Sequence, residues 1–120
     1  MIGKLPIYRD LFRLTTDLLN ELDNLPKKYR YSVGDRIIST SLETLHHLHA
    51  AYGAQDAQAR IDAMDRFATE FEMLRTLLRL CNESRLLSQR RLTCLFVSME
   101  SISKQLAGWR KSTKEKQHSR

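Results

Sequence analysis

The sequence predicts an all-α fold, an antiparallel up-down-up-down four-helix bundle. Apolar residues recur at intervals of three and four in four long segments, a spacing that places them on one face of a helix. Only two prolines and four glycines interrupt the 120 residues. No segment shows the alternation of apolar and polar residues that is typical of a half-buried strand. Four amphipathic helices joined by short turns are expected to bury their apolar faces against one another.

Composition indicates a single soluble domain. At 42% hydrophobic the chain is more apolar than a disordered protein, and 120 residues are enough for a substantial core. The sequence has neither a signal-peptide-like start nor an uninterrupted apolar run of the length that spans a bilayer. Cys81 and Cys94 lack CxxC spacing, so two free core thiols are favoured over a disulfide. We therefore expect a cytoplasmic protein without a membrane segment.

The first helix is expected at about residues 6–24. Pro6 suits an early helical position, and Pro26 lacks the amide hydrogen that a continuing helix needs. The apolar stripe consists of Ile7, Leu11, Leu14, Leu18, Leu22 and Leu25, widened by Tyr8, Phe12 and Leu19.

Residues 25–36 are interpreted as a basic and aromatic corner between the first two helices. Its cations and rings are interleaved: Lys27, Lys28, Tyr29, Arg30, Tyr31 and Arg36. Ser32 is expected to cap the second helix, and Asp35 suits the positive end of the helix dipole. The two tyrosines could stack on unpaired bases. Rings that cover the end of the bundle are the structural alternative.

The second helix is expected at about residues 33–52. Gly53 follows it at the place where a left-handed residue commonly ends a helix. The apolar stripe consists of Ile37, Ser41, Leu45, Leu48 and Tyr52 on one edge, with Ile38 and Leu42 on the other. His46 and His49 share a face and could hold a metal ion, but no third ligand accompanies them. Surface or interface histidines are therefore favoured.

The third helix is expected at about residues 56–82, with Asp56 as its N-cap. The fourth helix is expected to begin after Ser88 and to end near Gly108. The apolar stripes are Ala57, Ile61, Met64, Ala68, Phe71, Leu74, Leu78 and Cys81 in the third, and Leu92, Leu95, Phe96, Met99, Ile102 and Leu106 in the fourth. Residues 110–120 are polar or charged and are predicted to form a frayed or disordered basic tail, so the bundle domain is placed at residues 1–109.

Charge is divided unevenly along the chain. Residues 1–72 contain 9 Lys or Arg and 11 Asp or Glu, whereas residues 73–120 contain 11 Lys or Arg and 3 acids. A basic half indicates a polyanionic or acidic partner, with a solvated basic face as the alternative. The first and third connections of such a bundle lie at the same end. Eight cations are therefore predicted to converge there: Lys27, Lys28, Arg30, Arg75, Arg79, Arg85, Arg90 and Arg91.

The search for catalytic motifs is negative. The sequence contains no Gly-rich phosphate loop, no GxSxG, no HExxH and no paired Cys/His ligand set. It also lacks the Glu-x-x-His motifs of a diiron bundle. We therefore predict a non-catalytic binding protein that needs no cofactor. Arginines suit phosphate oxygens, so the surface is expected to bind nucleic acid in a salt-sensitive manner, and pairing with acids of a neighbouring subunit is the competing explanation.

Three short motifs carry a family resemblance. They are Pro26-Lys27-Lys28-Tyr29-Arg30-Tyr31-Ser32-Val33-Gly34-Asp35-Arg36-Ile37, Leu78-Arg79-Leu80 and Gly108-Trp109-Arg110-Lys111. With the order and length of the helices, they resemble the accessory variability determinant (Avd) proteins of diversity-generating retroelements. Those proteins are similar in turn to the four-helix-bundle proteins encoded in ribosomal-RNA intervening sequences. The last motif favours the Avd branch.

The resemblance implies a small basic protein that assembles into a homopentameric barrel. Avd proteins bind the reverse transcriptase and template RNA of the retroelement, support the mutagenic complementary-DNA synthesis that diversifies a target gene, and are not enzymes. Reverse transcriptase and RNA are thus the expected partners, with DNA or an RNA–DNA hybrid as further ligands. The expected binding surface comprises the eight converging cations with Tyr29 and Tyr31. Within it, the motifs support Lys27, Arg30 and Arg79 most directly.

The alternative is a stand-alone structural or interaction bundle of the intervening-sequence type. Replacement of Arg75, Arg79 and Arg91 with Ala separates the two hypotheses. An accessory protein is expected to lose partner binding in this variant while its helical content survives.

Overall fold

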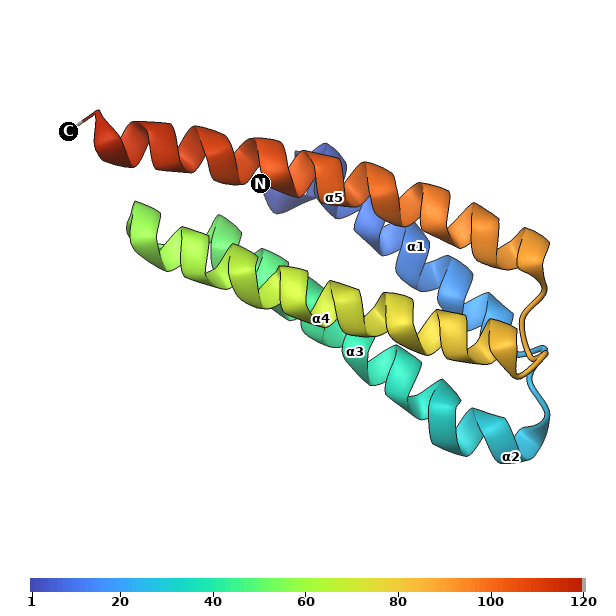
Figure 1. Cartoon of the computed structure of the whole chain (residues 1–120). Helices are drawn as coiled ribbons and strands as arrows, with labels where there is room; N and C mark the ends of the chain where they lie inside the picture. Colours follow the sequence, from blue (N-terminus) through green and yellow to red (C-terminus); the bar gives the residue numbers. More distant parts are fainter. Residues whose placement is uncertain (120) are drawn as a thin grey trace.

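Four long helices make up most of the chain in the computed structural model, which describes residues 1–119 (Figure 1). They are α1 (Pro6–Leu22), α3 (Asp35–Tyr52), α4 (Ala57–Glu83) and α5 (Gln89–His118). The short elements are the 3-10 turn η1 (Ile2–Lys4), α2 (Lys27–Tyr29) and the π-helical segment η2 (Arg30–Gly34). The part of the chain that the structure describes contains no strand. The predicted all-α fold is therefore confirmed.

The four helices alternate in direction and form a closed ring of neighbours. α1 packs against α3 and α5, and α4 packs against the same two helices, so α1 and α4 lie diagonally. The result is a rod of 53 × 23 × 23 Å (Figure 1). This is the four-helix bundle that the sequence predicts. No helix within residues 1–119 is both long enough and apolar enough to cross a bilayer.

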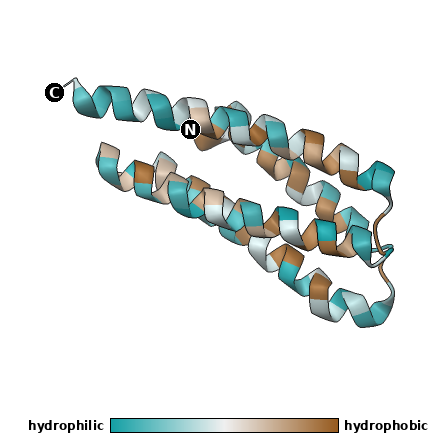
Figure 2. Ribbon diagram, viewed as in Figure 1, coloured by the Kyte–Doolittle hydropathy of each residue, from teal (hydrophilic) through white to brown (hydrophobic). Residues whose placement is uncertain are grey.

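Most residues of the predicted apolar stripes form the core of the bundle, but Phe12, Leu19, Leu42, Tyr52 and Ala68 are exposed, so their assignment to the buried faces is wrong. Each helix carries both hydrophobic and hydrophilic residues along its length (Figure 2). The buried hydrophobic residues of the four helices form a single cluster. Met64, Leu74, Met99 and Ile102 are completely buried. Burial of a side chain of this size contributes roughly 1.5–3 kcal/mol, so the core is the main source of stability. Cys94 is exposed on α5 and only Cys81 is a core thiol, so the prediction of two core thiols is wrong. The helix period places Cys94 two residues after the buried Leu92, on the outer face.

Two predicted helix caps are confirmed. The Asp56 side chain accepts a hydrogen bond from the Ala59 amide at 2.8 Å, and Ser88 accepts one from the Arg91 amide at 3.1 Å. These bonds satisfy backbone donors that have no partner within α4 and α5.

The helical path of the second helix begins earlier than the sequence predicts. The Pro26 carbonyl accepts bonds from the amides of Tyr29 and Arg30, so helical geometry starts directly after Pro26. Ser32 is not an N-cap, because its hydroxyl donates to the Lys28 carbonyl one turn earlier. Pro26 therefore ends α1 and also starts the next helix, and the predicted corner is helical. Buried Gly34 permits the π-helical turn, since a Cβ there would lie 3.2 Å from the Tyr29 carbonyl oxygen.

Two predictions about helix ends are also wrong, although α3 does end at Tyr52 as predicted. Gly53 has φ −88°, which is not left-handed. α5 does not end near Gly108 but continues to His118, in place of the predicted frayed tail. Thr113 is buried, and the Arg110 guanidinium pairs with Asp65 of α4 at 2.8 Å. Contacts with α4 hold the turns of α5 beyond Gly108. The prediction of a frayed tail rested only on the low apolar content of these residues, which does not reveal such contacts. The expectation for Arg120 lies outside the described residues.

Candidate binding surface

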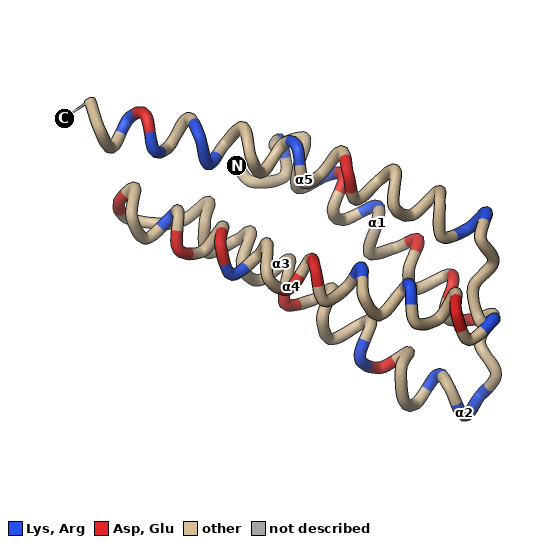
Figure 3. Tube along the Cα trace, viewed as in Figure 1, with Lys and Arg blue, Asp and Glu red and all other residues tan. Residues whose placement is uncertain are grey.

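One end of the bundle gathers a large share of the cations. The connection from α1 to α2 and the connection from α4 to α5 lie at this end (Figure 1), and Lys and Arg cluster around both (Figure 3). We call this region the basic end. The eight cations predicted for it are Lys27, Lys28, Arg30, Arg75, Arg79, Arg85, Arg90 and Arg91. Arg75 lies farther along the bundle than the others, because its partners Glu100 and Ser103 belong to the middle of α5. The contacts of the eight cations divide them into two groups.

The first turns after Pro26 present two lysines and a tyrosine to solvent. Lys27 and Lys28 are exposed, and the Lys28 ammonium lies 4.9 Å from the centroid of the Tyr29 ring. Tyr29 is half-buried, whereas Tyr31 is 68% exposed. Tyr31 therefore does not cover the core, and its ring is free to stack on a ligand. The structural alternative, a ring that covers the end of the bundle, therefore fits Tyr29 better than Tyr31.

Arg30 is held by the end of α1. Its Nε donates to the Leu25 carbonyl at 3.2 Å and its Nη2 to the Asp23 carbonyl at 3.4 Å. Asp23 caps the C-terminus of α1 and Leu25 lies in the connection beyond it, so the guanidinium satisfies carbonyls just past the helix and suits the negative end of the dipole. Arg30 thus has a role in the fold as well as a place in the predicted surface.

Arg75 forms a bridge between α4 and α5. Its side chain is 18% exposed, its Nη2 donates to Ser103 at 3.0 Å, and the same atom lies 3.7 Å from Glu100. Its Nε lies 3.1 Å from Glu72, but the N–H does not point at the carboxylate, so this contact is an ion pair and not a hydrogen bond. Arg75 is therefore paired within the chain and largely withdrawn from solvent.

Arg91 is likewise paired within the chain. Its Nε donates to the Glu21 carboxylate, which joins α5 to α1. This hydrogen bond, with the Coulombic attraction of Glu21, raises the pKa of the Arg91 guanidinium above its ordinary value. The sequence could not reveal this pair, because the two residues are 70 positions apart.

The other cations of the basic end point outward. Arg79, Arg85 and Arg90 are exposed and, with Lys27, form no ion pair within residues 1–119. Arg79 lies one turn beyond Arg75 on the same side of α4. Guanidinium and ammonium groups without internal partners can bind phosphate oxygens.

Arg85 has an unusual backbone. Its φ is 62°, the left-handed region that glycine adopts most readily. The Leu86 amide donates to the Cys81 carbonyl at 2.8 Å and the Arg85 amide to the Asn82 carbonyl at 3.0 Å, the paired bonds of a Schellman motif. Arginine occupies the position that usually carries glycine. Sequence patterns gave no signal for this, since an arginine does not indicate a left-handed residue.

Metal ligation receives no support from the geometry. Within residues 1–119, no three His, Cys, Asp or Glu side chains are grouped closely enough to hold a metal ion. His46 and His49 are exposed on α3. The His49 ring instead packs edge-on against Tyr8, with the centroids 5.6 Å apart.

Comparison with known proteins identifies one family. The bAvd-like family model matches residues 7–113, which include the basic end and nearly all of the bundle. Comparison with curated proteins gives no match.

Proposed function

Because the chain belongs to the bAvd-like family of Avd-type accessory proteins, we propose that it binds the reverse transcriptase and template RNA of a diversity-generating retroelement. In this proposal the protein is not a catalyst. It holds polymerase and RNA together during mutagenic complementary-DNA synthesis, and DNA or an RNA–DNA hybrid can occupy the same surface.

The observation that carries the proposal, besides the family, is the set of outward-pointing cations at one end. Lys27, Arg79, Arg85 and Arg90 are exposed around two adjacent connections, and exposed Tyr31 adds a ring that can stack on a base. Cations without internal partners can release counterions from a nucleic acid on binding. Paired Arg75 and Arg91 are assigned a supporting role.

Self-association into a pentamer is part of the proposal. Large apolar side chains remain exposed on every long helix: Phe12, Leu19, Leu42, Met73, Leu80 and Val97. Exposed apolar side chains on every long helix are available for contact with further copies of the chain.

The experiment compares two triple variants of equal charge change. Lys27, Arg79 and Arg90 are replaced with Gln in one, and Arg9, Arg13 and Arg66, exposed elsewhere, are replaced with Gln in the control. Binding to a structured RNA and to the reverse transcriptase is measured across a salt series, with the oligomeric mass measured alongside. This choice avoids Arg75 and Arg91, whose replacement with Ala would also remove contacts between helices.

We expect the basic-end variant to lose at least tenfold in RNA affinity and to show a shallower salt dependence, while the control binds nearly as the parent protein does. An equal loss of RNA affinity in both variants would show that binding depends on net charge and not on the basic end. A folded multimer that binds neither partner at low salt would favour the intervening-sequence alternative.

A further inference from the structure

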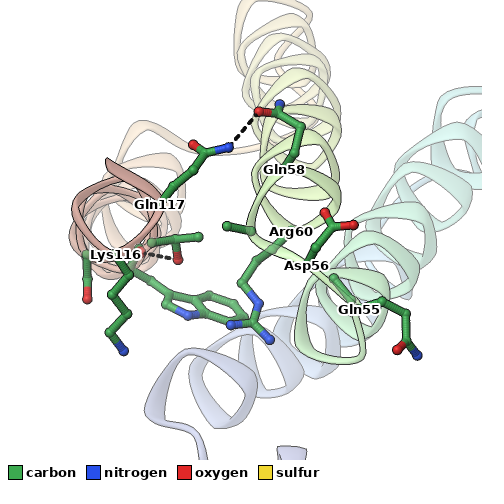
Figure 4. A pocket seen from close by; sticks show the side chains of 11 residues that line it. Gln55, Asp56, Gln58, Arg60, Lys116 and Gln117 are labelled. Atoms are coloured by element: carbon green, nitrogen blue, oxygen red, sulfur yellow. Dashed lines mark hydrogen bonds between the residues drawn. The ribbon is translucent and has the colours of Figure 1, made fainter. Parts of the chain in front are cut away.

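A hollow opens at the end of the bundle opposite the basic end. It has a volume of about 560 Å³ and lies between the start of α4 and the last turns of α5 (Figure 4). The unequal lengths of the helices explain it. α1 has 17 residues and α5 has 30, and Gln105 of α5 already contacts Asp10 near the start of α1. The turns of α5 beyond Trp109 therefore extend past α1 and are left uncovered on that side.

A flat cation and an aromatic ring form the wall of the hollow. The guanidinium carbon of Arg60 lies 5.6 Å from the centroid of the Trp109 ring. Arg60 is fixed in place, because its Nε donates to the Ala51 carbonyl at 2.9 Å and its Nη2 to the Tyr52 carbonyl at 3.4 Å. Arginine planes and aromatic rings are the two groups on which proteins stack unpaired bases.

Polar groups surround this wall. Gln117 of α5 and Gln58 of α4 point toward each other across the hollow, and the Gln117 amide donates to the Gln58 oxygen at 3.1 Å (Figure 4). Lys116 is exposed beside them and has no ion pair within residues 1–119. Residues 110–118 carry four cations and one acid, so the uncovered turns of α5 are basic.

We propose that this hollow, the distal site, binds an unpaired nucleotide of a single-stranded nucleic acid. The base stacks against the Arg60–Trp109 pair, the Gln117 side-chain oxygen accepts a hydrogen bond from the base edge, and Lys116 binds an adjacent phosphate. The volume lies within the roughly 300–1,000 Å³ of ligand sites. The distal site is separate from the basic end, so it does not depend on the function proposed above.

The experiment uses the fluorescence of Trp109, which is the single tryptophan of the chain. The full-length protein is titrated with a short oligouridylate, with blunt duplex RNA and with heparin, a polyanion without bases. We expect saturable quenching by the oligouridylate and little by the other two. Lys116→Gln is expected to lower the affinity about fivefold and to flatten the salt dependence by about 0.7 in slope, the value for one phosphate contact on a single strand. Lys104→Gln, an exposed cation of α5 outside the hollow, is the control.

Equal quenching by heparin would overturn the proposal in favour of a site for polyanions or acidic peptides. Oligouridylate binding without a change in Trp109 fluorescence would place the nucleic acid elsewhere. A Lys116→Gln variant with the affinity of the parent protein would also contradict the proposal. The basic-end triple variant separates the two sites. Quenching of Trp109 by the oligouridylate should persist in this triple variant. If the protein does not bind the reverse transcriptase but Trp109 is still quenched, the distal site is supported while the function proposed above is not.

Discussion

Arg75 of α4 lies between Phe71 of its own helix and Phe96 of α5, with its guanidinium carbon 5.7 Å from the centroid of each ring. Ser103 and Glu100 of α5 and Glu72 of α4 also contact it. A cation in this position joins two helices by stacking, hydrogen bonding and charge.

Arg75→Ala is therefore expected to destabilise the protein by about 2 kcal/mol, since a hydrogen bond to a charged group and a cation–π contact are each worth roughly 1 kcal/mol or more. Urea denaturation followed by circular dichroism measures the change. Arg79→Ala, one turn away and exposed, is the matched control and should shift the midpoint little. Unchanged stability with lost RNA binding would instead make Arg75 a direct contact.

Arg85→Gly is expected to stabilise the fold by about 1 kcal/mol, because glycine adopts the left-handed conformation without the steric cost that arginine carries. If the exposed guanidinium binds phosphate, the same substitution weakens RNA binding. Arg85→Lys keeps both the strain and the charge, so it should alter neither property much. A loss of stability in Arg85→Gly would show that the arginine side chain supports the turn.

The Asp65–Arg110 pair predicts a pH dependence. The hydrogen bond from Arg110 lowers the pKa of the Asp65 carboxyl below its ordinary value, and the Coulombic attraction of Arg110 and Lys114 adds to it. A lowered folded-state pKa means that the unfolded chain takes up the proton first as the pH falls, so the stabilisation is present at neutral pH and is lost below about pH 4. Asp65→Asn should therefore be less stable than the parent protein at pH 7, and the difference should shrink as the pH is lowered below about 4.

The expected difference is small, because the Asp65 side chain is 53% exposed and solvent screens the pair. Denaturant midpoints at low and moderate salt measure it, and added salt should reduce it. A difference between Asp65→Asn and the parent protein that grew toward pH 3 would contradict this account.

The two cysteines are expected to differ in reactivity. Cys94 is exposed, whereas Cys81 is buried and its burial raises the pKa of the thiol, which lowers the population of reactive thiolate. A colorimetric thiol reagent should therefore label one thiol per chain rapidly in the native protein, and Cys94→Ser should remove that fast phase. Rapid labelling that persists in Cys94→Ser would show that the core around Cys81 opens readily.

The helices could be predicted from the sequence because their signals are local. The three-four spacing of apolar residues placed all four long helices, and the short-range bonds of Asp56 and Ser88 placed two of their starts. Pro26 indicated the end of α1 correctly, but the sequence did not reveal that it also starts the helical turn of Lys27. Gly108 was wrongly expected to end a helix, because it is tolerated within α5, where a Cβ would meet nothing within 4 Å.

The binding surface could be predicted only in outline. The alternation of four helices places the first and third connections at one end, so the gathering of cations near Lys27 and Arg85 follows from topology. Which of them are available to a ligand depends on partners such as Glu21 and Glu100, which lie far from Arg91 and Arg75 in sequence.

By itself, then, the sequence determined the all-α bundle, its core and the end at which basic residues gather, because periodicity and chain direction are local or topological properties. The tertiary structure decided which arginines stabilise helix contacts and which face solvent. It also decided that the last turns of α5 are ordered against α4, and that the Arg60–Trp109 pair stands beside a hollow. The physical reason is that ion pairs, stacking and cavities arise between side chains from distant segments, and only packing brings those segments together.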